Sequence, residues 1–139
     1  MPGIFQALHP VLGARDVPLA VAWYVERLGF MLMFNDDTDP IRYAGVRRDD
    51  VELHLQWQDE SYFPAPGKDS PAYRFLVDDP DALFAEFRTS GALHTTAALR
   101  NTPWHTREFA VWDPNSRGLT FYKSLSQPHQ YAGTRCDSR

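Results

Sequence analysis

At 139 residues the chain has the usual length of one domain, and its 14 basic and 18 acidic residues give a net charge of −4. A hydrophobic content of 43% and a charged content of 23% are ordinary for a folded water-soluble protein and argue against disorder. The acidic balance argues against a nucleic-acid partner, which favours a basic surface. We therefore expect one compact unit.

The longest apolar run, residues 19–25, is too short to span a bilayer, and no signal peptide is readable at the N-terminus. We therefore expect a cytoplasmic protein with no membrane partner. The single cysteine, Cys136, lies in a polar tail, so a structural disulfide within the chain is excluded.

The first half of the chain predicts the element order β-α-β-β-β. A strand over residues 8–14 is followed by Asp16, which is suited to cap a helix, with Pro18 in the first helical turn. Gly29 then marks the end of that helix. Three strands follow, over residues 30–34, 41–46 and 51–57.

The second half predicts the same order after a linker rich in proline and glycine over residues 58–71. A strand over residues 73–77 leads to a helix that begins at Asp79-Pro80 and ends at Gly91. The three strands expected after this helix cover residues 93–97, 106–112 and 119–122.

The two halves repeat at a nearly constant offset. Sixty-three residues separate Asp16 from Asp79, and 62 separate Gly29 from Gly91, which indicates a duplicated module. We therefore predict an α+β domain over residues 1–139, in which two tandem βαβββ modules form a curved mixed sheet around a cleft. Its parts are the modules 7–57 and 72–123, the linker 58–71 and a polar C-terminal tail, 124–139.

Strand alternation predicts which side chains line the cleft. Leu53 and Leu55 should face the helix, and the intervening residues of that strand should face the cleft. The same rule gives cleft-facing positions on the first, fourth, fifth and last strands: His9, Glu52, His54, Gln56, Arg74, Thr120 and Tyr122. We assign Trp23, Trp57 and Trp112 mainly to the core.

Several short motifs have the order and spacing of a known family. The first module opens with the run from His9 to Asp16, followed by Trp23-Tyr24 and Leu28-Gly29-Phe30, and the second closes with the run from Pro103 to Gly118. Together they resemble the glyoxalase / bleomycin-resistance / extradiol-dioxygenase superfamily, also called vicinal oxygen chelate proteins. The resemblance covers about residues 9–122, and it implies a homodimer in which modules exchange between chains.

The resemblance also implies where metal ligands would lie, at the positions of His9, His54, Ala72 and Thr120. Alanine has no donor atom and a threonine hydroxyl is a poor ligand, so we expect no cofactor and no metal. This departure is similar to the bleomycin-resistance branch, which implies antibiotic resistance through binding of an aromatic or cationic small molecule without chemistry. Whether the chain is an enzyme stays open at this point.

Binding of that kind requires flat aromatic faces and acidic groups. Trp104 follows a proline in a loop, where an aromatic side chain has little packing role, and Glu108 lies on the next strand, exposed or inside the cleft. We expect Arg74 either to pair with a carboxylate such as Glu52 or to bind an anionic ligand. The expected ligand-binding residues are therefore His9, Glu52, His54, Gln56, Arg74, Trp104, Glu108, Thr120 and Tyr122.

Two other functions stay open. The first is a metal-dependent lyase or ring-opening dioxygenase, in which a divalent metal ion is held by His9 and His54 and by a third ligand from Glu52, Glu108 or a partner chain. The second is an interaction domain whose cleft is occluded.

Overall fold

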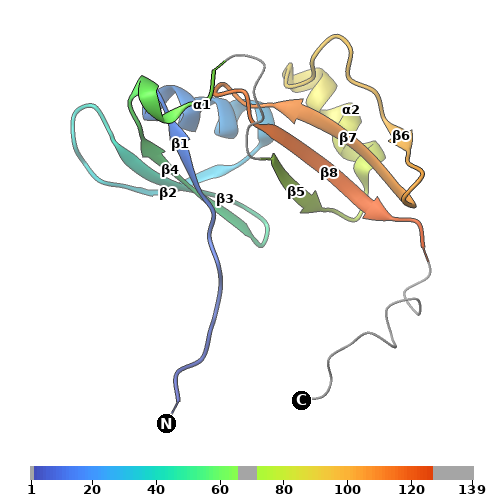
Figure 1. Cartoon of the computed structure of the whole chain (residues 1–139), viewed down its shortest axis with the longest axis horizontal. Helices are drawn as coiled ribbons and strands as arrows, with labels where there is room; N and C mark the ends of the chain where they lie inside the picture. The colour runs from blue at the N-terminus through green and yellow to red at the C-terminus, as the bar shows by residue number, and fades with distance from the viewer. Residues whose placement is uncertain (1, 66–71, 127–139) are drawn as a thin grey trace. The chain divides into compact units, whose positions relative to one another are not determined.

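A computed structural model describes residues 2–65 and 72–126, and in it the chain divides into two compact units (Figure 1). The first unit comprises Met1–Ser70 together with Asp113–Arg117, and the second comprises Pro71–Trp112 and Gly118–Arg139. Cys136 and most of the predicted tail lie outside the described residues. No helix in the described ranges is long and apolar enough to cross a membrane.

The first unit contains a four-stranded mixed sheet in the order β1-β4-β3-β2. Strand β1 runs parallel to β4, whereas β4 and β2 both run antiparallel to β3. Its elements are β1 (Val11–Ala14), α1 (Val17–Leu28), β2 (Met31–Asn35), β3 (Tyr43–Arg48), β4 (Val51–Trp57) and the short 3-10 helix η1 (Glu60–Tyr62).

The second unit repeats this topology in the order β5-β8-β7-β6. Its elements are β5 (Ala72–Leu76), α2 (Pro80–Ser90), β6 (Arg100–Asn101), β7 (Thr106–Trp112) and β8 (Gly118–Ser124). The α+β class and the two tandem βαβββ modules are thus confirmed. The strands of the described ranges form two sheets rather than one continuous sheet, and the shared cleft stays a prediction.

The predicted helix ends are confirmed in both modules. The Asp16 carboxylate accepts a hydrogen bond from the Leu19 amide at 3.0 Å, and the Asp79 carboxylate accepts one from the Ala82 amide at 3.0 Å. Gly29 and Gly91 end the helices with φ values of 75° and 84°, a backbone conformation that residues with a Cβ atom rarely adopt. These matching ends fix each helix at the same place in its module.

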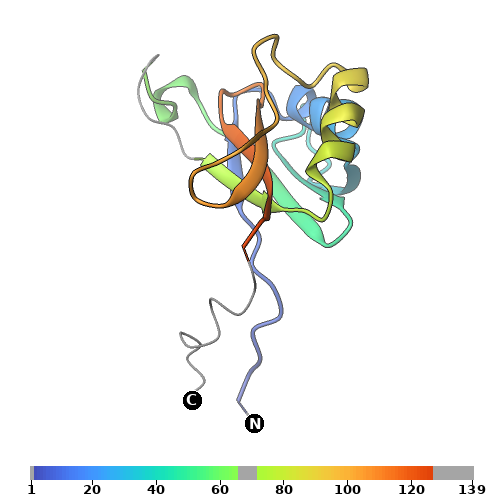
Figure 2. The same ribbon diagram turned by 90° about the vertical axis from the view of Figure 1, so that its right-hand side faces the viewer.

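Each helix covers one face of its own sheet, and this leaves the opposite face without a helix. In the first unit, the buried Tyr24 and Leu28 of α1 lie on the side of the buried Leu53 and Leu55. In the second unit, α2 packs on β7 and β8 (Figure 2), and its core is made of stacked and edge-on phenylalanine rings. These rings are Phe75, Phe84, Phe87, Phe109 and Phe121.

Most predicted strand ends lie within two residues of the structure, but two predicted strands differ more. The first begins at Val11 instead of Leu8. The strand predicted over residues 93–97 is wrong, because that segment turns: the Ala97 amide donates to the His94 carbonyl at 3.0 Å, and β6 forms only at Arg100–Asn101.

The turn between β7 and β8 belongs to the first unit. The buried Asp113 carboxylate accepts a hydrogen bond from the Tyr24 hydroxyl at 2.9 Å, and the Arg15 amide donates to the Asn115 side chain at 3.2 Å. The sequence predicted this segment only as a hairpin turn. Its packing against α1 gives it a second role in the core of the first unit.

Candidate functional site

The helix-free face of the first sheet carries four of the predicted site residues. Because Val11 pairs with His54 and Gly13 with Gln56, the alternation of β4 places Glu52, His54 and Gln56 on the face opposite Leu53 and Leu55. His9 precedes β1 and lies beside His54, with their ring centroids 5.1 Å apart. The prediction that these side chains share one face is confirmed in this geometry.

Three of these side chains form a close cluster. The His54 Nε2 atom lies 2.7 Å from the Glu52 carboxylate, and the His9 Nε2 atom lies 3.8 Å from it. One ligand atom from each residue lies within 4.8 Å of the others. The hydrogen bond from His54, together with the charges of His9, His54 and Arg47, holds the pKa of Glu52 below its ordinary value.

Aromatic groups fix the orientation of His54. The Tyr43 hydroxyl lies 2.7 Å from His54 Nδ1, which leaves Nε2 on the side of Glu52. The Phe34 ring meets the His54 ring edge-on at 5.2 Å and lies over Gly45, where any Cβ atom would collide with it. His54 is thus a positioned side chain rather than a freely rotating one.

The helix-free face of the second sheet carries the other predicted residues. Strand pairing places Arg74 beside Thr120, and Glu108 beside Tyr122. The Arg74 guanidinium donates to the Glu108 carboxylate at 3.0 Å, so Arg74 pairs with a carboxylate as expected, but that carboxylate is Glu108 and not Glu52. The same guanidinium lies 4.3 Å from the centre of the Tyr122 ring, so it covers one of the expected ligand-binding side chains.

Glu108 is the most enclosed charged group of this face, with 6% of its surface exposed. Thr106, Arg74 and Trp104 all donate to its Oε1 atom, at 2.6, 3.0 and 3.4 Å. Burial alone would raise the pKa of Glu108, but these donors and the charge of Arg74 outweigh burial and lower it. Within the described ranges no residue donates to Oε2, which leaves one carboxylate oxygen for a ligand.

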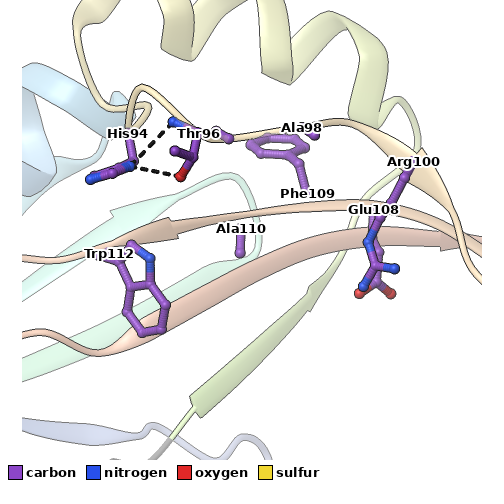
Figure 3. Close-up of a pocket in the computed structure, with 9 residues that line it drawn as sticks. His94, Thr96, Ala98, Arg100, Glu108, Phe109, Ala110 and Trp112 are labelled. Atoms are coloured by element: carbon purple, nitrogen blue, oxygen red, sulfur yellow. Dashed lines mark hydrogen bonds between the residues drawn. The ribbon is translucent and has the colours of Figure 1, made fainter. Parts of the chain in front are cut away.

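A pocket of about 260 Å³ lies beside Glu108 (Figure 3). Its walls come from the segment before β6, from β6 itself and from β7, and the residues are His94, Thr96, Ala97, Ala98, Arg100, Glu108, Phe109, Ala110 and Trp112. Of these, only Glu108 was predicted from the sequence. Trp112 lies four residues after Glu108 on β7, and side chains an even number of residues apart point to the same face of a strand. The alternation along β7 therefore predicts that Trp112 lies on the same face as Glu108.

Three tryptophans are more exposed than a core position allows. Trp104 and Trp112 expose 55% and 57% of their surface, and Trp57 exposes 39%. The assignments of Trp57 and Trp112 to the core are therefore wrong. In the first unit, the Arg42 guanidinium lies 4.1 Å from the centre of the Trp57 ring and covers it. In the second unit, Trp104 and Trp112 keep exposed indole surface.

Comparison with known proteins shows the family and the fold of the chain. The family model described as "Glyoxalase/Bleomycin resistance protein/Dioxygenase superfamily" matches residues 6–120. A bleomycin resistance protein from Geobacillus stearothermophilus is 25% identical over 129 residues, which cover 84% of this chain and 95% of that protein.

Solved structures give the same result. The bleomycin-binding protein of the bleomycin producer Streptomyces verticillus, solved with copper(II)-bleomycin, is 30% identical and has a TM-score of 0.69, covering 91% of this chain and all of that one. A bleomycin resistance determinant encoded on the transposon Tn5 shares the fold at 21% identity, with a TM-score of 0.72 and coverage of 88% and 100%. The chain therefore belongs to the glyoxalase/bleomycin resistance protein/dioxygenase superfamily.

Proposed function

We propose that this protein binds bleomycin or a related aromatic or cationic small molecule and sequesters it, without metal chemistry, in the clefts of a homodimer. The free Oε2 atom of Glu108 is the observation that carries this proposal. Because three donors converge on Oε1, the carboxylate is held charged and oriented, and Oε2 is left to accept a hydrogen bond from a cationic or amide N–H group.

The open indole rings beside Glu108 support the aromatic part of the proposal. Trp104 donates to Glu108, and Trp112 lines the adjacent pocket with more than half of its surface exposed. The six-membered ring of Trp112 lies against Gly118, and the exposed part of the indole is available for stacking. A planar ligand group and a nearby N–H donor would thus be recognised together.

The exposed apolar surface of the first unit supports a homodimer with module exchange. Strand β2, at the edge of its sheet, exposes four large apolar side chains in a row. The segment before β1 exposes Ile4, Phe5 and Leu8 almost completely. Large exposed apolar side chains gathered in one unit are typical of protein–protein interfaces. The four side chains on β2 are Met31, Leu32, Met33 and Phe34.

Calorimetric titration with metal-free bleomycin tests the proposal directly. We expect saturable binding, and a ligand present at about 100 times its dissociation constant should stabilise the fold by about 2.7 kcal/mol, a rise of roughly 10 °C in melting temperature. Light scattering on the same samples should give the mass of a dimer. Trp104→Ala should weaken binding, whereas a wild-type protein that gives no heat and no melting shift would contradict the proposal.

A metal-dependent activity is the second candidate, and the cluster of His9, Glu52 and His54 is the observation that favours it. Two imidazoles and one carboxylate are the donor set of many divalent iron, zinc and manganese sites, so the residues present fit such an ion. The Tyr43 hydroxyl on His54 Nδ1 would orient the ring for coordination through Nε2. A divalent ion bound there would polarise a substrate oxygen.

Elemental analysis of protein purified without chelator separates the two candidates. If the cluster binds a metal, we expect about one ion per chain, and His54→Ala and Glu52→Gln should both lose it because a three-ligand set is then incomplete. His94→Ala serves as a control, since His94 lies in the second unit, outside this cluster. Sub-stoichiometric metal in the wild type after dialysis against zinc would leave only the metal-free function.

A further inference from the structure

The outer edge of β7 is uncovered along much of its length. Strand β6 pairs only with Arg107 and Glu108, whereas β2, its counterpart in the first unit, pairs with β3 along Met31–Asn35. Within the described ranges, the remaining residues of β7, Phe109–Trp112, have a strand neighbour on the β8 side only. The outer edge of β7 is therefore mostly unpaired, whereas the corresponding edge of β3 in the first sheet is paired with β2.

Hydrogen bonds at the start of β7 show which backbone groups point to this open edge. The Thr106 carbonyl accepts from Thr102 on the β6 side at 2.8 Å. One residue earlier, the His105 carbonyl accepts from Leu125, which follows β8, at 2.8 Å. Strand backbone groups alternate in direction and the β7–β8 register has no bulge, so the N–H and C=O of Ala110 and Trp112 point outward.

The pocket of about 260 Å³ lies at this edge. Its lining includes Phe109, whose ring packs in the helix-side core, and also Ala110 and Trp112, whose side chains belong to the helix-free face. A pocket that contacts both faces of a strand must lie at the strand's edge. The segment from His94 to Ala98 runs alongside as the opposite wall (Figure 3).

His94 presents a hydrogen-bond donor in this wall. The Thr96 backbone N–H donates to His94 Nδ1 at 3.2 Å, so Nδ1 is the acceptor and, in the neutral ring, Nε2 carries the proton. At the other end of the pocket, Arg100 forms no ion pair with any described carboxylate and lies 5.6 Å from the Trp104 ring. The pocket thus has His94 at one end, the Arg100 guanidinium at the other and backbone amides of β7 along one side.

We propose that this pocket binds an extended peptide segment of the ligand as an additional strand on the open edge of β7. The amide groups of the ligand would exchange hydrogen bonds with Ala110 and Trp112, in the place that β6 leaves empty. At about 3.3 Å per strand residue, the open edge of Phe109–Trp112 accommodates about four residues. This inference rests on the proposed function only because it takes this pocket to be a ligand site. It adds that the ligand contains a peptide segment.

The pocket favours a short ligand segment over the edge strand of a second copy. The segment 94–98 closes its outer side, so a strand that belongs to another sheet has no room for its own neighbours. The small side chains of Ala97, Ala98 and Ala110 leave space for an extended backbone beside the larger groups of the lining. A single extended chain is the occupant that matches both features.

Nuclear magnetic resonance titration with acetyl-threonyl-valyl-threonine amide tests this inference without bleomycin. At millimolar peptide, we expect shifts of the amide signals of Ala110 and Trp112, with slower hydrogen exchange at both. The same peptide with its central amide N-methylated should bind about tenfold more weakly, because it loses a backbone hydrogen bond. Unmoved Ala110 and Trp112 signals, or equal binding of the two peptides, would overturn the proposal.

An edge variant adds a second readout. Ala110→Pro removes the outward N–H without touching the β8 ladder, since the Ala110 N–H points away from β8, and edge strands tolerate proline. It should fold and lose most of the peptide response, whereas Ala110→Ser should keep it. Peptide-free signals that broaden with protein concentration at Ala110 and Trp112 would instead indicate pairing between copies and also overturn the ligand assignment. A protein that binds peptide but not bleomycin would contradict the proposed function alone.

Discussion

Replacing Asp113 with alanine is expected to lower the free energy of unfolding by about 3–5 kcal/mol, because it leaves the buried Arg117 guanidinium without its counter-charge. Both residues are almost completely buried, with 5% and 4% of their surface exposed. The Asp113 carboxylate also accepts from the backbone amides of Asn115 and Arg117, at 2.8 and 2.9 Å, and from the Tyr24 hydroxyl. One substitution therefore removes the acceptor for several buried donors.

Urea unfolding followed by circular dichroism measures this loss, which is a large part of the total stability of a typical domain. Asp50→Ala is the matched control, because that carboxylate is fully exposed and lies 3.8 Å from Arg47; it should change stability very little. A second variant, with both Asp113 and Arg117 replaced by uncharged residues, should be less unstable than the two single losses added together. An Asp113→Ala protein as stable as the control would refute a structural role for this pair.

Sequence reasoning predicted the features that local chemistry decides. Aspartate caps and glycine ends placed both helices, because Asp16 and Gly29 satisfy backbone groups that every helix leaves open. Alternation in β4 placed Glu52 and His54 on the helix-free face, because a strand turns successive side chains to opposite sides. The duplicated spacing then predicted that both modules have one topology, and the two sheet orders confirm it.

Of the features that sequence reasoning missed, two are local and one depends on a contact between distant segments. Residues 93–97 have the composition of a strand, yet the His94–Thr96 hydrogen bonds close a turn there. Trp112 follows a buried apolar run and resembles a core residue, but its parity in β7 places it on the helix-free face. The pairing of Arg74 with Glu108 spans 34 residues, and no local pattern distinguishes it from a pairing with Glu52.

The packing of Asp113 on Tyr24 shows the same limit from the structural side. The Asp-Pro-Asn run predicted a hairpin turn, and the turn is present. The same residues satisfy α1 and the amide that follows β1, 89 and 100 positions earlier in the chain. A turn motif in the sequence does not indicate such long-range packing. The effect of this packing on stability is therefore evident only from the structure.

Glu108→Gln is expected to weaken bleomycin binding by about ten- to a hundredfold, the largest effect that we expect on ligand affinity. A hydrogen bond to a charged acceptor contributes about 1.5–3 kcal/mol, and glutamine keeps the volume of the side chain while removing the charge. Arg74 would then carry an unbalanced positive charge beside the ligand, which further disfavours a cationic group. Because the Arg74 side chain is 45% exposed, water can solvate it and the fold should survive.

The control is Asp81→Asn. This variant removes a carboxylate that lies 2.7 Å from the Arg107 guanidinium, in the same unit but on the exposed helix side. That variant should bind bleomycin as the wild type does. Affinities are measured by calorimetry at pH 7, and circular dichroism checks that each variant is folded. A Glu108→Gln affinity within about twofold of the wild type would rule out Glu108 as an anchor for the ligand.

The pH dependence gives an independent signature of the same carboxylate. The pKa of folded Glu108 lies below its ordinary value of 4.5, so it contributes stability and ligand binding fully above that pH. Both contributions should be lost as the pH falls through the lowered pKa, because protonation cancels the charge that Arg74 and the ligand require. In Glu108→Gln, this part of the loss of stability and ligand binding at acid pH should disappear. We therefore expect the bleomycin affinities of wild type and variant to differ fully above pH 4.5 and to converge as the pH falls through the lowered pKa of Glu108, which calorimetry across the acid range measures.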